Sequence, residues 1–269
     1  MEQVPAFQLC AIRYTAAAFI TFGIYVLFQN KHKPTREELK NAAIAGSIFL
    51  GLGTGGVAWA LNFVDTGLTA LIISAEPLII VMMMWAWTRK GPPIQTFAGI
   101  FIGILGMYLL ISQDTVIASS KDWFGLIAIF ASMLAWGVGS IFVSQATLPK
   151  SQFLNSGIQM LVGGFATLIL SFIFQEKGIP PSEYVSITWI GIAFLVLFGS
   201  VAAFTAFNYL LKQVSPEKVA TNTYVNPIIA MILGAVFREE IITNQSILAA
   251  CIMLCGVFVV NTTKNLQSA

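Results

Sequence analysis

Nine apolar segments, each about 20 residues long, restrict the possible fold more than any other feature of the sequence. An α-helix needs about 20 apolar residues to cross the hydrocarbon core of a bilayer. Transmembrane strands would instead alternate apolar and polar residues, and the segments show no such alternation. The sequence therefore predicts an all-α membrane protein, a helical bundle of nine spans. The predicted spans cover about residues 7–28, 41–63, 67–88, 94–112, 123–144, 153–174, 188–210, 217–237 and 245–262.

The composition agrees with a position in the lipid bilayer. Hydrophobic residues make up 57% of the 269 residues and charged residues only 10%, whereas soluble domains usually carry about 25% charged residues. With a mean hydropathy of +0.82, a soluble domain of this size would have too little polar surface to cover itself. The net charge of +2 gives no indication of nucleic-acid binding. No cleavable signal peptide is expected, because no basic segment precedes a short apolar core at the N-terminus.

The distribution of lysine and arginine predicts the orientation of the bundle. If the N-terminus lies outside, ten basic residues fall in cytoplasmic segments and three in outer segments, which is a strong positive-inside bias. We therefore expect a multi-pass protein of the inner (plasma) membrane with a cytoplasmic C-terminus. The ten are Lys31, Lys33, Arg36, Lys40, Arg89, Lys90, Lys150, Lys212, Lys218 and Lys264, and the three are Lys121, Lys177 and Arg238.

An internal repeat relates the two halves of the sequence. The segments ALNF at 60–63 and AFNY at 206–209 each close a span. Each is followed by a span that contains a proline, Pro77 or Pro227. A glutamine follows each proline after 18 residues, and a glycine follows it after 29 residues. The repeated unit is therefore half of the bundle.

The order of the spans decides the topology of the repeat. The span with Pro77 would run from outside to inside, and the span with Pro227 from inside to outside, so the two halves are inverted. Inverted repeats with interrupted helices are typical of secondary transporters. We expect the first repeat at 1–114, with four spans, and the second at 120–264, with five. The first repeat lacks a counterpart of the span at 123–144.

The run NYLLKQVSPEKVATNTYVNPIIAMILGAVFREE resembles the second-half signature of EamA-type transporters, which belong to the drug/metabolite transporter superfamily. This resemblance implies ten helices in two inverted halves, a central substrate cavity, and export or exchange of small metabolites. The chain departs from the family pattern because the first helix is absent and the first proline span ends in basic rather than acidic residues. The matching positions are Tyr224, Pro227, Glu239 or Glu240, and Gly256, with Pro5 and Arg13 resembling the family's second helix.

Glu76 is the most unusual residue within the spans, since it lies about midway along an apolar segment, directly before Pro77. A charged carboxylate at the bilayer centre costs roughly 3 kcal/mol, and such residues usually face a bundle interior. Thr69, two helical turns earlier, would share the same face. Three interpretations are open: Glu76 binds a cationic or amine-bearing substrate, carries a coupling proton, or only ties helices together.

Further residues within the spans are candidates for the same site. Asn226 occupies the position that matches Glu76 in the second half. Amides at this depth either bind substrate or tie helices together, and aromatic residues either line a cavity or pack. The two prolines indicate either a water-filled cavity or packed kinks, because each removes a backbone donor. The substrate-binding candidates besides Glu76 and Thr69 are Asn222, Tyr224, Asn226, Trp59, Trp136 and Gln159, and the helix-break candidates are Pro77 and Pro227.

Other features within the spans have structural interpretations. Asn62 and Asn208 lie near span ends, and we interpret them as interhelical ties. Gly99 and Gly103 form a face of small residues for close helix contact, either within the fold or in a homodimer. Arg13 would snorkel to the membrane surface, pair with a carboxylate, or meet an anionic substrate.

The sequence gives no indication of an enzyme, a metal site or a bound cofactor. The spans contain no catalytic constellation or phosphate-binding loop, and Cys10, Cys251 and Cys255 are interpreted as small packing residues. We therefore expect a secondary transporter in the lipid bilayer that exports or exchanges a small metabolite, amino acid or drug-like solute. The alternative is a non-transporting membrane sensor, a partner subunit or a truncated inactive relative.

Overall fold

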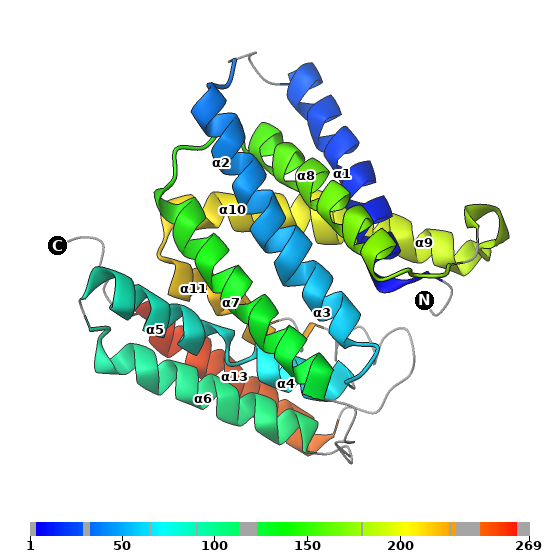
Figure 1. Ribbon diagram of the computed structural model, residues 1–269. Helices are drawn as coiled ribbons and strands as arrows, with labels where there is room; N and C mark the ends of the chain where they lie inside the picture. The colour runs from blue at the N-terminus through cyan, green and yellow to red at the C-terminus, as the bar shows by residue number, and fades with distance from the viewer. Residues whose placement is uncertain are drawn as a thin grey trace. The chain divides into compact units, whose positions relative to one another are not determined.

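The computed structural model describes residues 4–28, 33–64, 66–89, 91–112, 123–178, 180–225, 228–229 and 243–262. In these ranges every regular element is a helix, which confirms the predicted all-α class (Figure 1). Five of the described helices are long and apolar enough to cross a bilayer, so the chain is a multi-pass membrane protein. They cover Ala6–Phe28, Arg36–Ala60, Trp123–Gln145, Gln152–Ile173 and Ser186–Gln213.

The chain forms two compact units, which are described separately. Unit 1 comprises Met1–Asn62 and Phe130–Gln213, and unit 2 comprises Phe63–Ile129 and Val214–Ala269. Each predicted repeat therefore contributes segments to both units.

Unit 1 is built from long apolar helices. A π-helical segment, η1 (Ser47–Thr54), joins α2 to α3, and a second one, η3 (Leu195–Ala202), joins α9 to α10. Each joined set therefore forms one continuous membrane-crossing helix. The helices are α1 (Ala6–Phe28), α2 (Arg36–Gly46), α3 (Gly55–Ala60), α8 (Gln152–Ile173), α9 (Ser186–Phe194), α10 (Ala203–Gln213) and most of α7 (Trp123–Gln145), with a short 3-10 helix, η2 (Pro181–Glu183), before α9.

Side chains next to the helix starts explain where two of these helices begin. Thr35 and Glu38 form a capping box before α2, in which each side chain accepts a backbone N–H from the other residue. The Ser151 hydroxyl accepts the N–H of Leu154 at 3.2 Å and caps α8 in the same manner.

Helices α1 and α8 pack side by side in an antiparallel arrangement (Figure 1). A Cβ on Gly157 would lie 2.6 Å from Phe22 Cε1, and a Cβ on Gly164 would lie 2.8 Å from Thr15 Oγ1. Residues near the start of α8 thus contact the end of α1, and residues later in α8 contact residues earlier in α1. The glycines allow this close approach, since any larger residue would require the helices to separate.

Helix positions recur between the two halves of the chain. Thr21 in α1 donates its hydroxyl proton to the carbonyls of Ala17 and Ala18, at 3.0 and 2.9 Å. Thr167 in α8 makes the same two contacts with Gly163 and Gly164, both at 3.0 Å. The π-helical segments η1 and η3 are also alike, since each spans eight residues and joins two α-helices into one continuous span.

Unit 2 contains shorter helices and a helix break. It contains α4 (Thr66–Ile73), α5 (Glu76–Thr88), α6 (Ile94–Ile111), α11 (Pro216–Ala220) and α13 (Asn244–Thr262). Helices α4 and α11 begin 150 residues apart, and so do α6 and α13. The same spacing separates the two prolines of the predicted repeat.

Helices α6 and α13 are also antiparallel, and glycines form their contact (Figure 1). A Cβ on Gly256 would lie 2.7 Å from the Gly103 nitrogen and 2.7 Å from the Gly99 carbonyl oxygen. Towards the other end, Gln245 Nε2 donates to the Leu109 carbonyl at 2.9 Å. The predicted face of small residues is therefore used within the fold, and it gives no support to a homodimer.

Glu176 fixes the start of α1 in unit 1. Its two carboxylate oxygens accept the backbone N–H groups of Phe7 and Gln8, at 3.0 and 3.1 Å. These N–H groups lie in the first helical turn, where the helix offers no internal partner. A negative charge there also interacts favourably with the helix dipole.

The Glu176→Ala variant should be less stable than the wild-type protein. Loss of a helix cap costs about 1 kcal/mol, so we expect a lower unfolding temperature in detergent. The matched control is Glu183→Ala, because Glu183 is an exposed acid in the same loop. Equal unfolding temperatures for the two variants would show that the cap contributes nothing to stability.

Candidate functional site

Glu76 begins a new helix in unit 2 rather than continuing an existing one. Helix α4 ends at Ile73, a turn follows at residues 74–75, and α5 starts at Glu76 with Pro77 in its first turn. The Ala75 N–H bonds the Ile72 carbonyl at 3.0 Å, three residues back instead of four. Proline is tolerated in a first helical turn, where its missing N–H has no internal partner. The span is therefore interrupted at Glu76 and Pro77.

The Glu76 side chain is buried, with 9% of its surface exposed. In the described part of the chain, no cation forms an ion pair with it. Its position in the first turn of α5 favours a carboxylate, because the positive end of the helix dipole lies there. Glu76 is thus a buried acid, and none of the described cations balances a negative charge on its carboxylate.

Thr69 and Tyr224 are both buried in unit 2. Thr69 in α4 is 3% exposed, and its hydroxyl has no hydrogen-bond partner in the described ranges. Tyr224 is fully buried on Gly103, and its hydroxyl donates to the Ile100 carbonyl at 3.3 Å. The turn at 74–75 interrupts the helical register on which the predicted common face of Thr69 and Glu76 depends. A role in substrate binding remains a prediction for both residues.

Of the remaining second-half candidates, the structure describes only Asn222. Asn222 belongs to a helical stretch at residues 222–225, and its side chain is exposed. Asn226 and Pro227 lie outside the described residues. The predicted correspondence between Glu76 and Asn226 therefore stays a prediction.

The two tryptophan candidates lie in aromatic contacts of unit 1. The Trp136 ring lies 4.8 Å from the Phe49 ring and 5.1 Å from the Phe207 ring. Trp59 lies 5.2 Å from the Phe174 ring. Both side chains are half-buried, so each packs against its neighbours and is also partly exposed. That they line a substrate cavity stays a prediction.

Gln159 lies at the centre of a fully buried polar cluster in unit 1. Its Nε2 donates to Asn155 Oδ1 at 3.0 Å and to Asn208 Oδ1 at 3.1 Å. Asn208 Nδ2 in turn donates to the Phe204 carbonyl and to the Ser156 hydroxyl. Gln159 Oε1 is buried and has no partner within the described ranges. The cluster joins α8 to α10 and leaves one acceptor free for a water molecule or a solute donor.

The interhelical tie predicted for Asn208 is confirmed, whereas the one predicted for Asn62 is wrong. Asn62 is exposed, and its Nδ2 donates at 3.0 Å to the Trp59 carbonyl, three residues earlier. It closes the end of its own helix instead of joining two helices. Asn155 and Ser156 were not identified from the sequence, although the spacing of four residues between Asn155 and Gln159 is a signal for such a contact.

The Asn208→Ala variant should lower stability measurably. It leaves buried donors and acceptors unpaired, which costs about 1–3 kcal/mol. The Asn62→Ala variant is the matched control, since an exposed substitution usually changes stability by less than about 0.5 kcal/mol. The measurement is thermal unfolding in detergent, and equal unfolding temperatures would refute the interhelical tie.

Arg13 also links two helices of unit 1. Its Nε donates to Ser200 Oγ in η3 at 2.6 Å, and its guanidinium lies 5.1 Å from the centre of the Tyr14 ring. In the described part of the chain no carboxylate pairs with it. The interpretation that Arg13 neutralises an acid therefore has no support from these residues.

The family model described as the EamA-like transporter family matches residues 1–112 and 123–262. The chain belongs to the EamA-like transporter family. Members of this family are transporters rather than enzymes, so the chain is a membrane transporter. This result agrees with the resemblance found in the sequence.

Similar proteins and structures support this assignment. The chain is 30% identical to an uncharacterized inner membrane transporter, YedA of Escherichia coli, over the whole chain and 86% of the relative. It is 23% identical to the uncharacterized transporter YoaV of Bacillus subtilis, covering 96% of the chain and 88% of the relative. A crystal structure with 18% identity superposes with a TM-score of 0.81, covering 96% of this chain and 89% of the other. That similarity shows that the two share a fold.

Proposed function

We propose that this EamA-like transporter is a secondary transporter that exports or exchanges a small metabolite, amino acid or drug-like solute by alternating access. The observation that carries the proposal is the antiparallel pairing of matching helices, α1 with α8 and α6 with α13. Two antiparallel helices cross a membrane in opposite directions, as the matching helices of inverted repeats must do. Rocking of inverted halves about a site at mid-depth is a common route to alternating access.

The interrupted helix supports a substrate site near Glu76. Helix breaks in transporters are tolerated where the freed backbone groups line a cavity, and they recur at substrate sites. Glu76 lies directly at the break between α4 and α5. A buried acid in this position would bind a cationic or amine-bearing solute, or it would carry a coupling proton. Four further residues are proposed to complete the site. They are Thr69, which precedes Glu76 in the first half, and Asn222, Tyr224 and Asn226 from the second half.

We further propose that the protein lies in the plasma membrane with its C-terminus in the cytoplasm. It rests on the excess of lysine and arginine in the predicted cytoplasmic segments. A C-terminal fusion to a reporter that is active only in the cytoplasm would test the orientation.

Transport by the purified protein in lipid vesicles tests the proposed function. A screen for export-dependent resistance in cells would first select candidate solutes. Vesicles loaded with a selected unlabelled solute should then accumulate the labelled solute by counterflow, whereas protein-free vesicles should not. Resistance without counterflow would favour a non-transporting sensor or partner subunit that acts through another membrane protein.

A further inference from the structure

A groove lies between α1 and α8, at the end of the pair where α1 begins and α8 ends. Its cavity has a volume of about 610 Å³. From α1 it is lined by Gln8, Ala11 and Ile12, which follow each other at helical spacings of three and four residues. From α8 it is lined by Leu168, Ser171 and Phe172, which have the same spacing, and Gln175 follows just beyond the end of that helix. The groove therefore runs along the helix pair for about two turns.

The polarity of the groove changes along its length. The apolar residues Ile12 and Leu168 line it within the two helices. Gln8, Gln175 and Lys177 line the other end, and the latter two lie beyond the last residue of α8, Ile173. Because α8 is long and apolar enough to span a bilayer, we expect this polar end at the level of the lipid head groups. The apolar end reaches into the hydrocarbon region.

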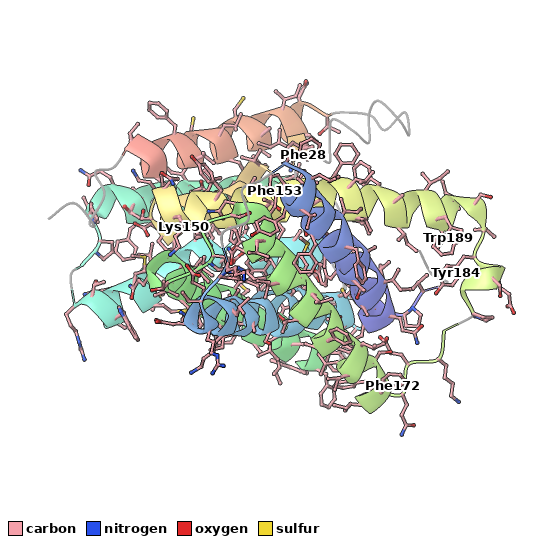
Figure 2. The ribbon with its side chains drawn as sticks, turned by 90° about the horizontal axis from the view of Figure 1, so that it is seen from above. Phe28, Lys150, Phe153, Phe172, Tyr184 and Trp189 are labelled. Atoms are coloured by element: carbon pink, nitrogen blue, oxygen red, sulfur yellow. The ribbon has the colours of Figure 1, made fainter. Side chains whose placement is uncertain are left out.

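The surroundings of the groove are those of a surface in contact with lipid. Phe165 and Phe172 on α8 are 57% and 75% exposed, which suits lipid contact. Tyr184, which also lines the groove, lies 5.5 Å from Trp189 near the start of α9 (Figure 2). Tyrosine and tryptophan concentrate at the boundary between membrane and water. The groove thus crosses this boundary with its polar end outward.

We propose that the groove binds a phospholipid of the adjacent leaflet. The Lys177 ammonium would hold the phosphate, and one acyl chain would lie on Ile12 and Leu168. The Gln175 amide would donate to the phosphate oxygens, as would the second N–H of Gln8 Nε2, whose first is donated to the Glu176 carbonyl at 3.2 Å. A water-soluble solute would leave the apolar half of the groove unfilled.

The Glu176 carboxylate also borders the groove and would repel a phosphate. Both of its oxygens accept backbone N–H groups of α1. The positive end of the α1 dipole offsets its charge there, so Lys177 determines the sign of the polar end.

The test measures how much added phospholipid binds to the protein purified in mild detergent. Native mass spectrometry with added phosphatidylglycerol gives the fraction of protein that carries one lipid. Lys177→Gln removes the cation, and Leu168→Trp fills the apolar end. The matched controls are Lys150→Gln, which removes an exposed lysine elsewhere, and Phe165→Trp, which enlarges an exposed residue of α8 outside the groove. All four variants are first checked for an unchanged unfolding temperature without added lipid.

We expect Lys177→Gln to reduce binding about fivefold, the effect of one lysine near a membrane surface. Leu168→Trp should also reduce binding, because it fills the space for the acyl chain, while both controls bind as the wild type does. Equal binding by all variants would overturn the proposal. Binding of diacylglycerol, which has the same chains without phosphate, as tightly as phosphatidylglycerol would also overturn it, since the polar end would then have no role. Neither outcome depends on transport activity.

Discussion

Replacing Glu76 with glutamine should abolish transport or uncouple it from the pH gradient, while leaving the protein in the membrane. Glutamine has nearly the same shape, so the packing around the helix break should be kept. It lacks the charge, and a hydrogen bond to a charged group contributes about 1.5–3 kcal/mol, so solute affinity should fall by roughly one to two orders of magnitude. Insertion should not suffer, because the variant removes an acid that costs roughly 3 kcal/mol at the bilayer centre.

Two assays on the Glu76→Gln variant separate the proposed roles of the acid. If Glu76 binds a cationic solute, counterflow in vesicles should be lost. If Glu76 carries the coupling proton, counterflow should persist and only transport driven by an imposed pH gradient should be lost. The Glu183→Gln variant changes an exposed loop acid and should behave as the wild type in both assays. Wild-type activity of Glu76→Gln in both assays would leave Glu76 with a purely structural role.

Replacing Gly256 with valine should have the largest effect on stability. The added Cβ would meet backbone atoms of Gly103 and Gly99, both at 2.7 Å, and backbone cannot move aside as a flexible side chain can. Overpacking usually costs about 1–3 kcal/mol, and we expect the upper end of this range. Thermal unfolding in detergent, together with the yield of folded protein, measures the effect.

Gly23→Val is the matched control for the glycine contact. Gly23 also lies within a membrane-crossing helix, but a Cβ there would have no neighbour within 4 Å. The control should therefore unfold at about the wild-type temperature. If both valine variants lost the same stability, helix propensity would explain the effect and the close contact of α6 with α13 would not.

Local patterns in the sequence predicted much of the fold. The length of the apolar segments predicted the helical membrane class, and the Glu76–Pro77 pair marked the place where the structure interrupts a helix. The spacing of Gly99 and Gly103 predicted a close helix contact, which α13 provides. These features depend on residues within a few turns of each other, so a single segment contains the information.

The contacts between distant segments could not be predicted in the same way. Nothing local indicates that Glu176 caps a helix that begins 170 residues earlier, at Ala6. The amide cluster combines Gln159 with Asn208 from another helix, and only the pair on α8 had a recognisable spacing. The wrong interpretation of Asn62 has the same cause, because its position matched that of Asn208 but its neighbours did not.

Water access to position 76 tests the central claim, a hydrated site open to each side of the membrane in turn. Cys10, Cys251 and Cys255 would first be replaced, and a single cysteine would then be placed at Glu76 or, as a control, at the exposed position Met82 on the same helix. Sealed vesicles would be treated with a membrane-impermeant thiol reagent from one side or the other. The Glu76→Cys variant should react from both sides and be protected by an added substrate, whereas the lipid-facing Met82→Cys variant should stay unlabelled. If the Glu76→Cys variant reacts from neither side, position 76 is not part of a hydrated site and the proposed mechanism is wrong.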